Sequence, residues 1–368
     1  MAKLRIFPDR IIKNISKMND YCKKYNKEWT FVTKVLGGYK PLLEKILHDE
    51  VILGTHSIGD SRVSSLRTIK KINPNLVTMY LKPPSSAYVK NLVKYADISL
   101  NTEFSTIKKL NEEAKNQKKT HQIIIMIEMG ELREGVVREK FLDFYSKVFE
   151  LKNIDVIGIG TNLGCMYGIE PTFDKLIQLS LYEQLIEIKF QRDLKLVSGG
   201  SSITLPLLGK GKVPKTVNHL RIGEAIFLGT SPFNNKKFSN LSTNAFEFDA
   251  NIVEYEKKEQ MPDGIIGEGN VGHADLINKS TETVQEYKAV LDFGVVDVDI
   301  NNIKPKDQSA KFVGTTSDLT VYSLGKKPKE YKTGKVLRFS PDYMAVARLM
   351  NSKFIEKKLF GKKIERKI

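Results

Sequence analysis

The residues Gln122-Ile-Ile-Ile-Met-Ile-Glu128 form a continuous apolar run that is bounded by polar residues. A run of this length is typical of a strand buried on both faces, as in a parallel sheet. A helical pattern precedes it over Glu103–Asn116, where apolar residues recur every three or four positions, and another follows over Lys140–Leu151. The segment therefore predicts a strand between two amphipathic helices.

The same alternation extends in both directions from this segment. Further helical patterns cover Asp9–Lys24, Ser61–Ile72 and Asp174–Phe190. Short apolar runs predict seven more strands, at Thr30–Lys34, Val51–Thr55, Leu76–Leu81, Asp97–Thr102, Asp155–Asn162, Lys195–Gly199 and His219–Leu228. Eight strands that alternate with helices predict an α/β fold of the (β/α)8 TIM-barrel type. A doubly wound parallel sheet is the competing interpretation, but such sheets more often have five or six strands.

The pattern changes near Asn234. Residues Ala245–Tyr255 alternate apolar and polar side chains, as a half-buried antiparallel strand does. Similar segments follow at Val284–Phe293, Lys311–Gly314, Asp318–Ser323 and Lys335–Phe339. We therefore expect a barrel domain over residues 9–233 and a mainly antiparallel β domain made of residues 1–8 plus 234–368.

Composition excludes several classes of protein. Hydrophobic residues make up 41% of the 368 residues and charged residues 28%, which is ordinary for a globular chain and excludes dominant disorder. No apolar run approaches the length of a membrane span, and the first residues lack the pattern of a signal peptide. Two cysteines, Cys22 and Cys165, exclude a disulfide framework and a cysteine-based zinc site. We expect a cytoplasmic protein without a membrane partner.

The net charge of +16 raises the question of a nucleic-acid partner. Apart from the basic end at Lys353–Ile368, the lysines are scattered along amphipathic segments, where solvated helix faces explain most of them. Nucleic-acid binding is therefore the weakest interpretation, and the sequence predicts no such partner. A small anionic ligand, such as a phosphorylated cofactor, is compatible with the same charge.

Two motifs in the second domain carry little weight. Residues 267–272 spell Gly-x-Gly-x-x-Gly, but the motif binds a dinucleotide only between a strand and a long helix, and here it is more simply a loop between strands. His273 and Asp275 are two residues apart in the same loop. A metal there would need further ligands from elsewhere, so the sequence predicts no metal site.

The strand ends of a barrel define its active site, because the loops after the strands form the catalytic face. Polar or cationic residues stand at or near the ends of four predicted strands, as Lys34, the segment Glu128–Gly135 with Arg133, Thr161-Asn162 and Ser198-Gly-Gly-Ser-Ser202, and the last predicted strand contains Arg221-Ile-Gly223. A lysine that closes a buried strand is either a solvated edge residue or an amine that can form a Schiff base. A glycine- and serine-rich loop suits a phosphate. Together these residues indicate a phosphorylated aldehyde cofactor bound through a lysine.

These motifs resemble the fold-type III pyridoxal-phosphate enzymes, and within them the alanine/ornithine racemase family. The resemblance covers essentially the whole chain and favours the ornithine racemase branch. It is carried by Val32-Thr-Lys34, Tyr95–Glu103, Ile124–Gly135, Val197–Ser202 and Leu220–Glu224.

The resemblance implies roles for individual residues. Lys34 would carry pyridoxal 5'-phosphate as a Schiff base, and Arg133 would contact the phenolic oxygen of the cofactor. Asn162 stands where the family has a ring-contacting residue, and Arg221 would face the pyridine nitrogen. The phosphate would be held by Ser201, Ser202 and the amide of Gly223.

The sequence also departs from the family. Alanine racemases have a tyrosine four residues after the lysine, where this chain has Gly38 followed by Tyr39. In the family, a tyrosine from the β domain of the partner subunit acts as an acid/base, and the matching loop here, Gly267–Asp275, has no tyrosine. This loop contains His273, which we predict as the second acid/base. A water or Asp318 is an equal alternative for that role. The phosphate-binding tyrosine near the C-terminus has no clear counterpart beyond Tyr343. The loop Gly314–Asp318 resembles the family's substrate-carboxylate loop with changed residues.

The leading prediction is a pyridoxal-phosphate-dependent racemase that interconverts L- and D-amino acids through a Lys34 Schiff base and an α-carbanion, and that forms a head-to-tail homodimer; the sequence does not name the amino acid. The alternatives are a non-catalytic pyridoxal-phosphate-binding protein and a metal-assisted D-amino-acid aldolase of the same fold. A cationic substrate such as ornithine would need a carboxylate in the pocket, for which the sequence offers Glu224, Asp297, Asp299 and Asp318.

Overall fold

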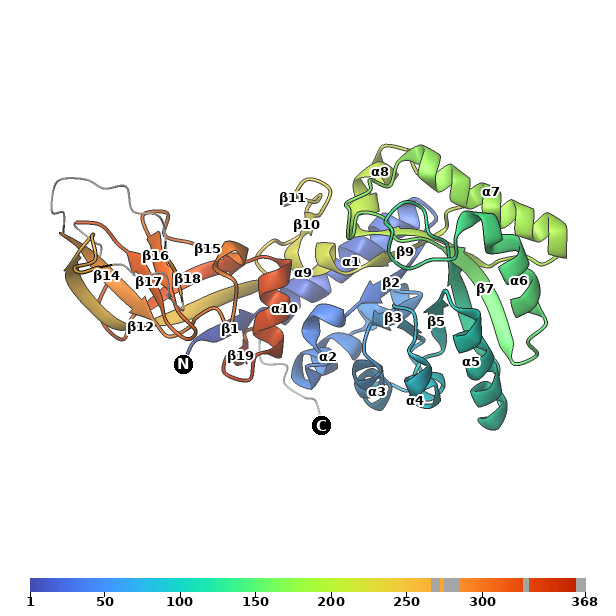
Figure 1. Cartoon of the computed structure of the whole chain (residues 1–368), viewed down its shortest axis with the longest axis horizontal. Helices are drawn as coiled ribbons and strands as arrows, with labels where there is room; N and C mark the ends of the chain where they lie inside the picture. Colours follow the sequence, from blue (N-terminus) through green and yellow to red (C-terminus); the bar gives the residue numbers. More distant parts are fainter. Residues whose placement is uncertain (266–271, 275–284, 327–330, 362–368) are drawn as a thin grey trace. The chain divides into compact units, whose positions relative to one another are not determined.

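The structure is a computed structural model, and it describes residues 1–265, 272–274, 285–326 and 331–361 (Figure 1). The chain divides into two compact units, Asp9–Thr243 and a second unit that combines Met1–Pro8 with Asn244–Ile368. Among the helices of the described residues, none has the length and apolar character needed to cross a lipid bilayer.

Eight parallel strands of the first unit close into a barrel, in which β9 pairs with β2. The predicted fold class, a TIM-type barrel followed by an antiparallel domain, is confirmed, and the doubly wound alternative is wrong. The strands are β2 (Glu28–Val32), β3 (Ser57–Asp60), β4 (Thr78–Tyr80), β5 (Ile98–Asn101), β6 (His121–Met126), β7 (Ile154–Gly160), β8 (Leu196–Ser201) and β9 (His219–Ile222). We call their carboxyl ends, with the loops that follow them, the mouth of the barrel.

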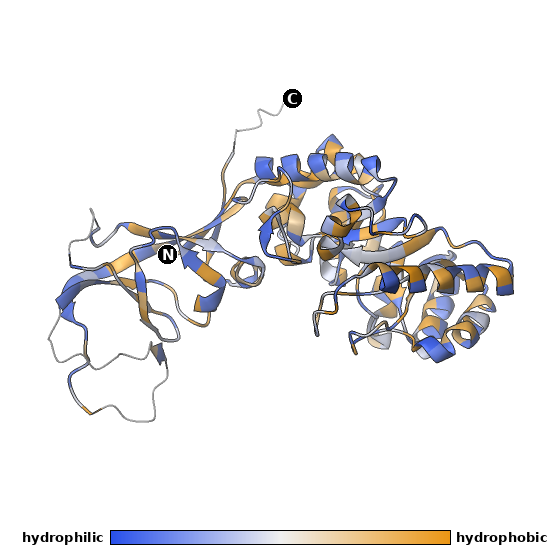
Figure 2. Cartoon of the chain, turned by 90° about the horizontal axis from the view of Figure 1, so that it is seen from above, coloured by the Kyte–Doolittle hydropathy of each residue, from blue (hydrophilic) through white to orange (hydrophobic). Residues whose placement is uncertain are grey.

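Helices surround these strands (Figure 1). They are α1 (Pro8–Lys24), α2 (Lys40–Leu47), α3 (Val63–Ile72), α4 (Val89–Tyr95), α5 (Phe104–Asn116), α6 (Phe141–Phe149), α7 (Phe173–Phe190), α8 (Leu205–Gly209) and α9 (Glu224–Leu228). Hydrophobic and hydrophilic residues alternate around the longer ones (Figure 2). In α5 the predicted apolar stripe is buried at Ile107, Leu110 and Ala114, and each large apolar side chain buried in this way stabilises the fold by about 1.5–3 kcal/mol.

A cluster of buried apolar side chains joins strands β4 to β8. It consists of Met79, Ile98, Leu100, Ile124, Met126, Ile157 and Leu196. Strands β2, β3 and β9 instead carry the buried polar side chains Thr30, Ser57 and His219. These three polar side chains are what we call the polar side of the barrel, although strands β4 to β6 also carry buried polar residues, namely Thr78, Ser99, Asn101 and His121.

Two predicted strands differ from the structure. Residues 51–54 lie in a 3-10 helix (Glu50–Gly54), and the second barrel strand is Ser57–Asp60. Periodicity missed this strand because Ile58 is its one large apolar side chain, while Ser57 and Asp60 are buried as polar residues: the Ser57 Oγ lies 2.7 Å from Thr30 Oγ1, and Asp60 accepts from Thr33. The last predicted strand, 219–228, ends at Ile222 because helix α9 begins two residues later.

The second unit is built on a mainly antiparallel sheet. Its path is β13-β16-β17-β14-β12-β1-β19, with β18 pairing β12 and β15, and only β1 and β19 run parallel among these pairs. The strands are β1 (Lys3–Ile6), β12 (Phe246–Glu259), β13 (His273–Ala274), β14 (Gln285–Leu291), β15 (Ile303–Pro305), β16 (Lys311–Thr315), β17 (Thr320–Ser323), β18 (Val336–Pro341) and β19 (Glu356–Leu359). Helix α10 (Tyr343–Asn351) belongs to the same unit, and β10 (Thr230–Ser231) and β11 (Lys236–Lys237) form a small hairpin in the barrel unit.

Candidate active site

Lys34 lies at the mouth of the barrel, directly after strand β2. Its backbone begins a 3-10 helix, Lys34–Leu36, instead of extending the strand. The Lys34 side chain is exposed, whereas Thr33 and Val35 on either side are buried. The Thr33 hydroxyl lies 2.9 Å from Asp60 Oδ2, which ties this turn to strand β3. The backbone at Lys34 is thus fixed while its amine projects from the mouth.

The turn after Lys34 accounts for one departure from the family. Gly38 has a φ of +74°, and a Cβ built there would lie 3.0 Å from Ser65 Oγ. A tyrosine at this position would need a left-handed backbone and would press on Ser65. Tyr39 is instead the residue that precedes helix α2.

The backbone of the loop after strand β6 depends on particular residues at two of its positions, Glu128 and Gly135. The Glu128 carboxylate accepts hydrogen bonds from the Gly130 and Leu132 amides, at 2.6 and 2.9 Å. Gly135 has a φ of +151°, and a Cβ there would come within 2.2 Å of the Glu128 nitrogen. The glycine is therefore required for the loop to return against strand β6 and hold Arg133 at the mouth.

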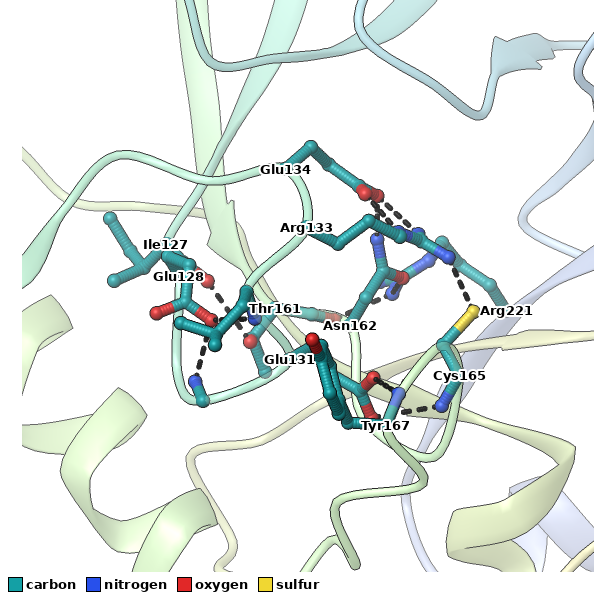
Figure 3. Close-up of polar contacts among 12 residues, drawn as sticks. Ile127, Glu128, Glu131, Arg133, Glu134, Thr161, Asn162, Cys165, Tyr167 and Arg221 are labelled. Atoms are coloured by element: carbon teal, nitrogen blue, oxygen red, sulfur yellow. Dashed lines mark hydrogen bonds and ion pairs between the residues drawn. The ribbon is translucent and has the colours of Figure 1, made fainter.

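Glu131 fixes a second loop, which follows strand β7. Its buried carboxylate accepts from the backbone amides of Cys165, Tyr167 and Ile169 at 2.8–2.9 Å (Figure 3). Burial opposes ionisation, but these donors hold the pKa of Glu131 below its usual range. A charged Glu131 thus joins the loops after β6 and β7.

Arg133 and Asn162 meet on one carboxylate. Glu134 pairs with the Arg133 guanidinium and also accepts from Asn162 Nδ2, while Arg133 contacts Cys165 Sγ (Figure 3). Burial raises the pKa of Glu134, but the bonds from Arg133 and Asn162 outweigh burial, and the pKa is lowered overall. Glu134 therefore carries its charge between two predicted cofactor contacts.

Arg221 is the most deeply buried cation of the mouth, with 5% of its surface exposed. It donates to Thr161 O at 2.7 Å, to Asn162 Oδ1 at 2.8 Å, and to both the Oγ and the carbonyl oxygen of Ser198. Burial lowers the pKa of Arg221 to about 10, and the negative charge of Glu134 acts against this shift. The guanidinium is therefore protonated near neutral pH and held in one orientation.

The loop after strand β8 forms a polar cradle. Ser202 is buried, and its Oγ accepts from the Ala225 amide at 3.2 Å, whereas Ser201 is half-buried. Thr204 Oγ1 is fully buried with no hydrogen-bond partner among the described residues, and a Cβ at Gly200 would come within 2.0 Å of it. Gly223 adjoins the cradle, where a Cβ would meet the Val32 carbonyl oxygen at 3.0 Å.

This set of donors fits pyridoxal phosphate. Two serine hydroxyls, an unpartnered threonine hydroxyl and glycine backbone suit a phosphate group, since phosphate accepts several hydrogen bonds from such loops. Lys34 follows strand β2 and Arg221 lies on the neighbouring strand β9, because β2 pairs with β9 with Thr30 opposite Arg221. The mouth thus offers an amine, a phosphate cradle and a fixed cation together.

Other predicted residues lie in the second unit. His273 is exposed on strand β13, which pairs with β16, while Asp275 and residues 267–271 lie outside the described residues. The described residues contain no group of three or more His, Cys, Asp or Glu side chains that could hold a metal ion. Asp318 is exposed and accepts from Ser317 Oγ.

The remaining candidates are dispersed. Asp297 accepts from the Ser352 hydroxyl, and Asp299 accepts from the Asn301 amide, both within the second unit. Tyr343 opens helix α10 in that unit. Glu224 is in the barrel unit, at the start of α9.

Sequence reasoning gave no role to Glu134, Ser198, His219 or Thr204. Glu134 is next to Arg133 in the quoted motif. The sequence around it does not indicate that its carboxylate accepts a hydrogen bond from Asn162. Ser198 and His219 look like ordinary strand residues. Their importance appears only when strands β8 and β9 lie side by side.

Comparisons with known proteins agree with this architecture. The model of the alanine racemase N-terminal domain matches residues 6–232. An ornithine racemase of Acetoanaerobium sticklandii is 30% identical over 97% of this chain and 99% of its own length. A lysine racemase of Thermotoga maritima is 30% identical over 96% of this chain and 97% of its own length.

Solved structures show the same fold. The structure of alanine racemase from Bacillus anthracis superposes with a TM-score of 0.73 at 15% identity, over 98% of this chain and 95% of that one. Together with the family match and the two relatives, this confirms the resemblance drawn from the motifs. The chain belongs to the alanine racemase family, in the branch that contains ornithine and lysine racemases, and it is an amino-acid racemase.

Proposed function

We propose that this racemase uses pyridoxal 5'-phosphate bound at the barrel mouth and interconverts the L and D forms of a basic amino acid. The observation that supports it best is the set of residues at the mouth: the exposed Lys34 after β2, the buried Arg221 guanidinium on the neighbouring strand β9, and the loop with Ser202 and Thr204 after β8. The ornithine and lysine racemases in the comparison support the substrate class.

The bound group supplies an electron-withdrawing ring that makes the α-proton of the substrate acidic. Lys34 would hold the aldehyde carbon of this group, and its amine would take or return the α-proton of the substrate on one face. Ser201, Ser202 and the Gly223 amide would hold the phosphate. Arg133 would donate to the phenolic oxygen, and Glu134 keeps the Arg133 guanidinium in place.

Arg221 decides which reaction is favoured. A guanidinium has donors and no acceptor, so it can only donate to the ring nitrogen. A ring nitrogen held by Arg221 would therefore carry no proton of its own, and Arg221 would in this way favour return of the α-proton, and so racemisation over transamination.

Asn162 holds Arg221 and Glu134 at a fixed spacing, because its amide accepts from one and donates to the other.

A second acid/base must act on the opposite face of the substrate, and we propose His273 of a partner subunit in a homodimer. Histidine has the unperturbed pKa best suited to proton transfer near neutral pH. His273 is exposed on the short strand β13, where a second chain can reach it. Asp318 or a water remains the alternative group.

The function is tested by a substrate screen. The purified chain is incubated with pyridoxal phosphate and single enantiomers of ornithine, lysine, alanine and other amino acids, with and without a divalent metal. We expect the optical rotation of ornithine or lysine to decay to zero from either enantiomer, without a metal.

Two outcomes would contradict the proposal. Binding of pyridoxal phosphate without loss of rotation for any amino acid would indicate a non-catalytic binding protein. Metal-dependent cleavage of a D-β-hydroxy amino acid to an aldehyde would indicate an aldolase.

The shared site is tested by mixing two variants. We expect Lys34→Ala and His273→Ala each to lose racemase activity. When they are mixed and allowed to exchange subunits, about one quarter of the wild-type activity returns, because half of the dimers are mixed and each has one intact site. His273→Ala alone still exchanges the α-proton of one enantiomer with deuterated water, through Lys34.

The outcomes distinguish the elements of this proposal. Undiminished racemisation by His273→Ala removes His273 from the mechanism. Two inactive variants that stay inactive when mixed, while sedimentation shows subunit exchange, contradict a site shared between subunits.

A further inference from the structure

A chain of hydrogen bonds runs from Arg221 into the polar side of the barrel. Arg221 Nη1 donates to Ser198 Oγ. Ser198 Oγ lies 2.8 Å from His219 Nδ1, and His219 Nε2 lies 2.9 Å from Thr30 Oγ1. Ser198, His219 and Thr30 are fully buried, so no bulk water competes for these bonds.

The chain continues to the opposite end of the barrel. Thr30 Oγ1 lies 2.7 Å from Ser57 Oγ, which lies 3.2 Å from His56 Nδ1. His56 Nε2 is 3.8 Å from the Glu28 carboxylate, and this carboxylate is 61% exposed. Glu28 is the first residue of β2, so the bonded side chains connect the mouth with the amino ends of the strands.

The direction of every bond follows from Arg221. An arginine has only donors, so Ser198 Oγ must accept from it. Among the hydrogen bonds of Ser198 Oγ in the described residues, His219 Nδ1 is the acceptor for the hydroxyl proton, so we assign this nitrogen as unprotonated. His219 is neutral with its proton on Nε2, and it donates to Thr30. Burial is the main cause that lowers the pKa of His219 well below its usual range, and the positive charge of Arg221 acts in the same direction.

The same direction holds in the lower half. Thr30 accepts from His219, and its own proton has two acceptors, Ser57 Oγ at 2.7 Å and Met79 Sδ at 3.7 Å. The serine oxygen is the nearer and stronger acceptor, so we assign the proton to Ser57, which then donates to His56 Nδ1. The remaining His56 proton, on Nε2, faces the negative charge of Glu28. Each lone pair in the chain points toward Arg221 and each proton points away from it, which is the arrangement that stabilises a buried cation.

We propose that His219 is a positioning residue that acts through Ser198 to hold the Arg221 guanidinium charged and oriented at the mouth. Without His219, the Ser198 hydroxyl loses the imidazole nitrogen that accepts its proton. The proton then points toward the Arg221 guanidinium. Only the kinetic consequence of this proposal rests on the proposed function. The protonation state of His219 is a property of the chain itself.

The chain provides a matched control in His121. This histidine is also buried, on strand β6, and its Nε2 lies 2.8 Å from Ser99 Oγ on the adjacent strand. No hydrogen bond of His121 or Ser99 among the described residues leads to Arg221, and His121 Nδ1 has no partner there. Replacing either histidine removes a buried imidazole bonded to a serine, but only His219 is connected to the site.

The first test measures the protonation of the histidines without cofactor or substrate. The chain has five histidines, so ¹⁵N-histidine NMR of the full-length apoprotein is tractable, with assignment by single His→Gln variants. At pH 7 we expect His219 to be neutral with its proton on Nε2. A proton on Nδ1, or a charged ring, reverses the direction of the bond to Ser198 and overturns the proposal.

The second test uses the holoenzyme and its preferred amino acid. Since an oriented donor at a reaction centre is worth up to about 10²–10³-fold in rate, and His219 acts one bond away, we expect His219→Leu to lower kcat by about 10–100-fold with KM unchanged. His219→Gln restores most of the rate, because its amide accepts from Ser198 and donates to Thr30. His121→Leu leaves kcat within about twofold.

Each contrary result counts against the proposal. Equal losses in His219→Leu and His121→Leu, or no recovery in His219→Gln, would indicate general destabilisation of the barrel. If His219→Leu does not fold, Ser198→Ala against Ser99→Ala makes the same comparison. Failure to find a racemised amino acid would remove the proposed substrate class, while the NMR result would still decide the state of His219.

Discussion

Lys34→Ala is expected to abolish racemisation, with a fall in kcat of at least about 10⁴-fold. The amine of Lys34 has two tasks at the mouth, covalent attachment of the cofactor and proton transfer on one face, and each general acid/base contributes about 10²–10⁴-fold. Alanine keeps the exposed position and needs no new backbone conformation, so the barrel should fold as before. The rate is measured from the decay of optical rotation at saturating cofactor.

The attachment is checked on the wild-type chain. Reduction of the holoenzyme with borohydride, followed by peptide mapping, should leave the pyridoxyl group on Lys34. A label on another lysine would overturn the assignment.

Lys40→Ala is the matched control for Lys34→Ala. Lys40 is an exposed lysine on the same segment, and among the described residues it forms an ion pair with Glu44 on the surface of α2. Exposed pairs of this kind contribute about 0–1 kcal/mol, so this variant should racemise normally and retain its stability. Equal rates for the two variants would show that Lys34 takes no part in the reaction.

Arg221→Met should lower kcat by about 10²–10³-fold, which is the cost of removing one preorganised donor from a buried site. The substitution also leaves the Thr161 and Ser198 carbonyl oxygens and the Asn162 amide oxygen without their donor. Each unsatisfied buried acceptor costs about 1–3 kcal/mol, so the melting temperature should fall as well. Rate and thermal unfolding are measured on the same preparation.

The wild-type pH profile gives a second test of Arg221. The active form is the protonated guanidinium, and burial lowers its pKa to about 10. Activity that depends on this charge should therefore decline as the pH rises through about 10. Arg67→Met, at an exposed arginine of α3, should leave the rate and the pH profile unchanged. A fully active Arg221→Met variant would contradict the role of the guanidinium.

Much of the barrel was predictable because its strands are buried on both faces and therefore appear as apolar runs. Strand β6 is the plainest case, and its boundaries in the structure differ from the prediction by one residue at the start and two at the end. Strand β3 shows the limit of this signal. Its residues Ser57 and Asp60 are buried through hydrogen bonds, so the chain there has no apolar run and the prediction fell on residues 51–55 instead.

The candidate site was predictable to the extent that it follows strand ends. Lys34, Arg133 and Asn162 were predicted at or after strand ends and Arg221 within the last strand, and the resemblance to the family gave these residues their roles. In the structure all four lie toward the carboxyl ends of the barrel strands or in the loops that follow them. The hydrogen-bond partners of these residues could not be predicted from strand ends. Glu134, for example, is adjacent to Arg133 in the sequence, and two neighbouring opposite charges in a loop look like a solvent-exposed ion pair. Its bond to Asn162 depends on the loops after β6 and β7 meeting.

The sequence alone determined the number of βα repeats, the change to alternating strands, and which polar residues follow the barrel strands. These are local properties, since side-chain periodicity and chain order express them without any long-range contact. Only the tertiary structure decided the hydrogen-bond chain through Ser198, His219, Thr30 and Ser57. Those residues come from four strands that are separated in the sequence, and their donors and acceptors meet only because closing the barrel places β8, β9, β2 and β3 side by side.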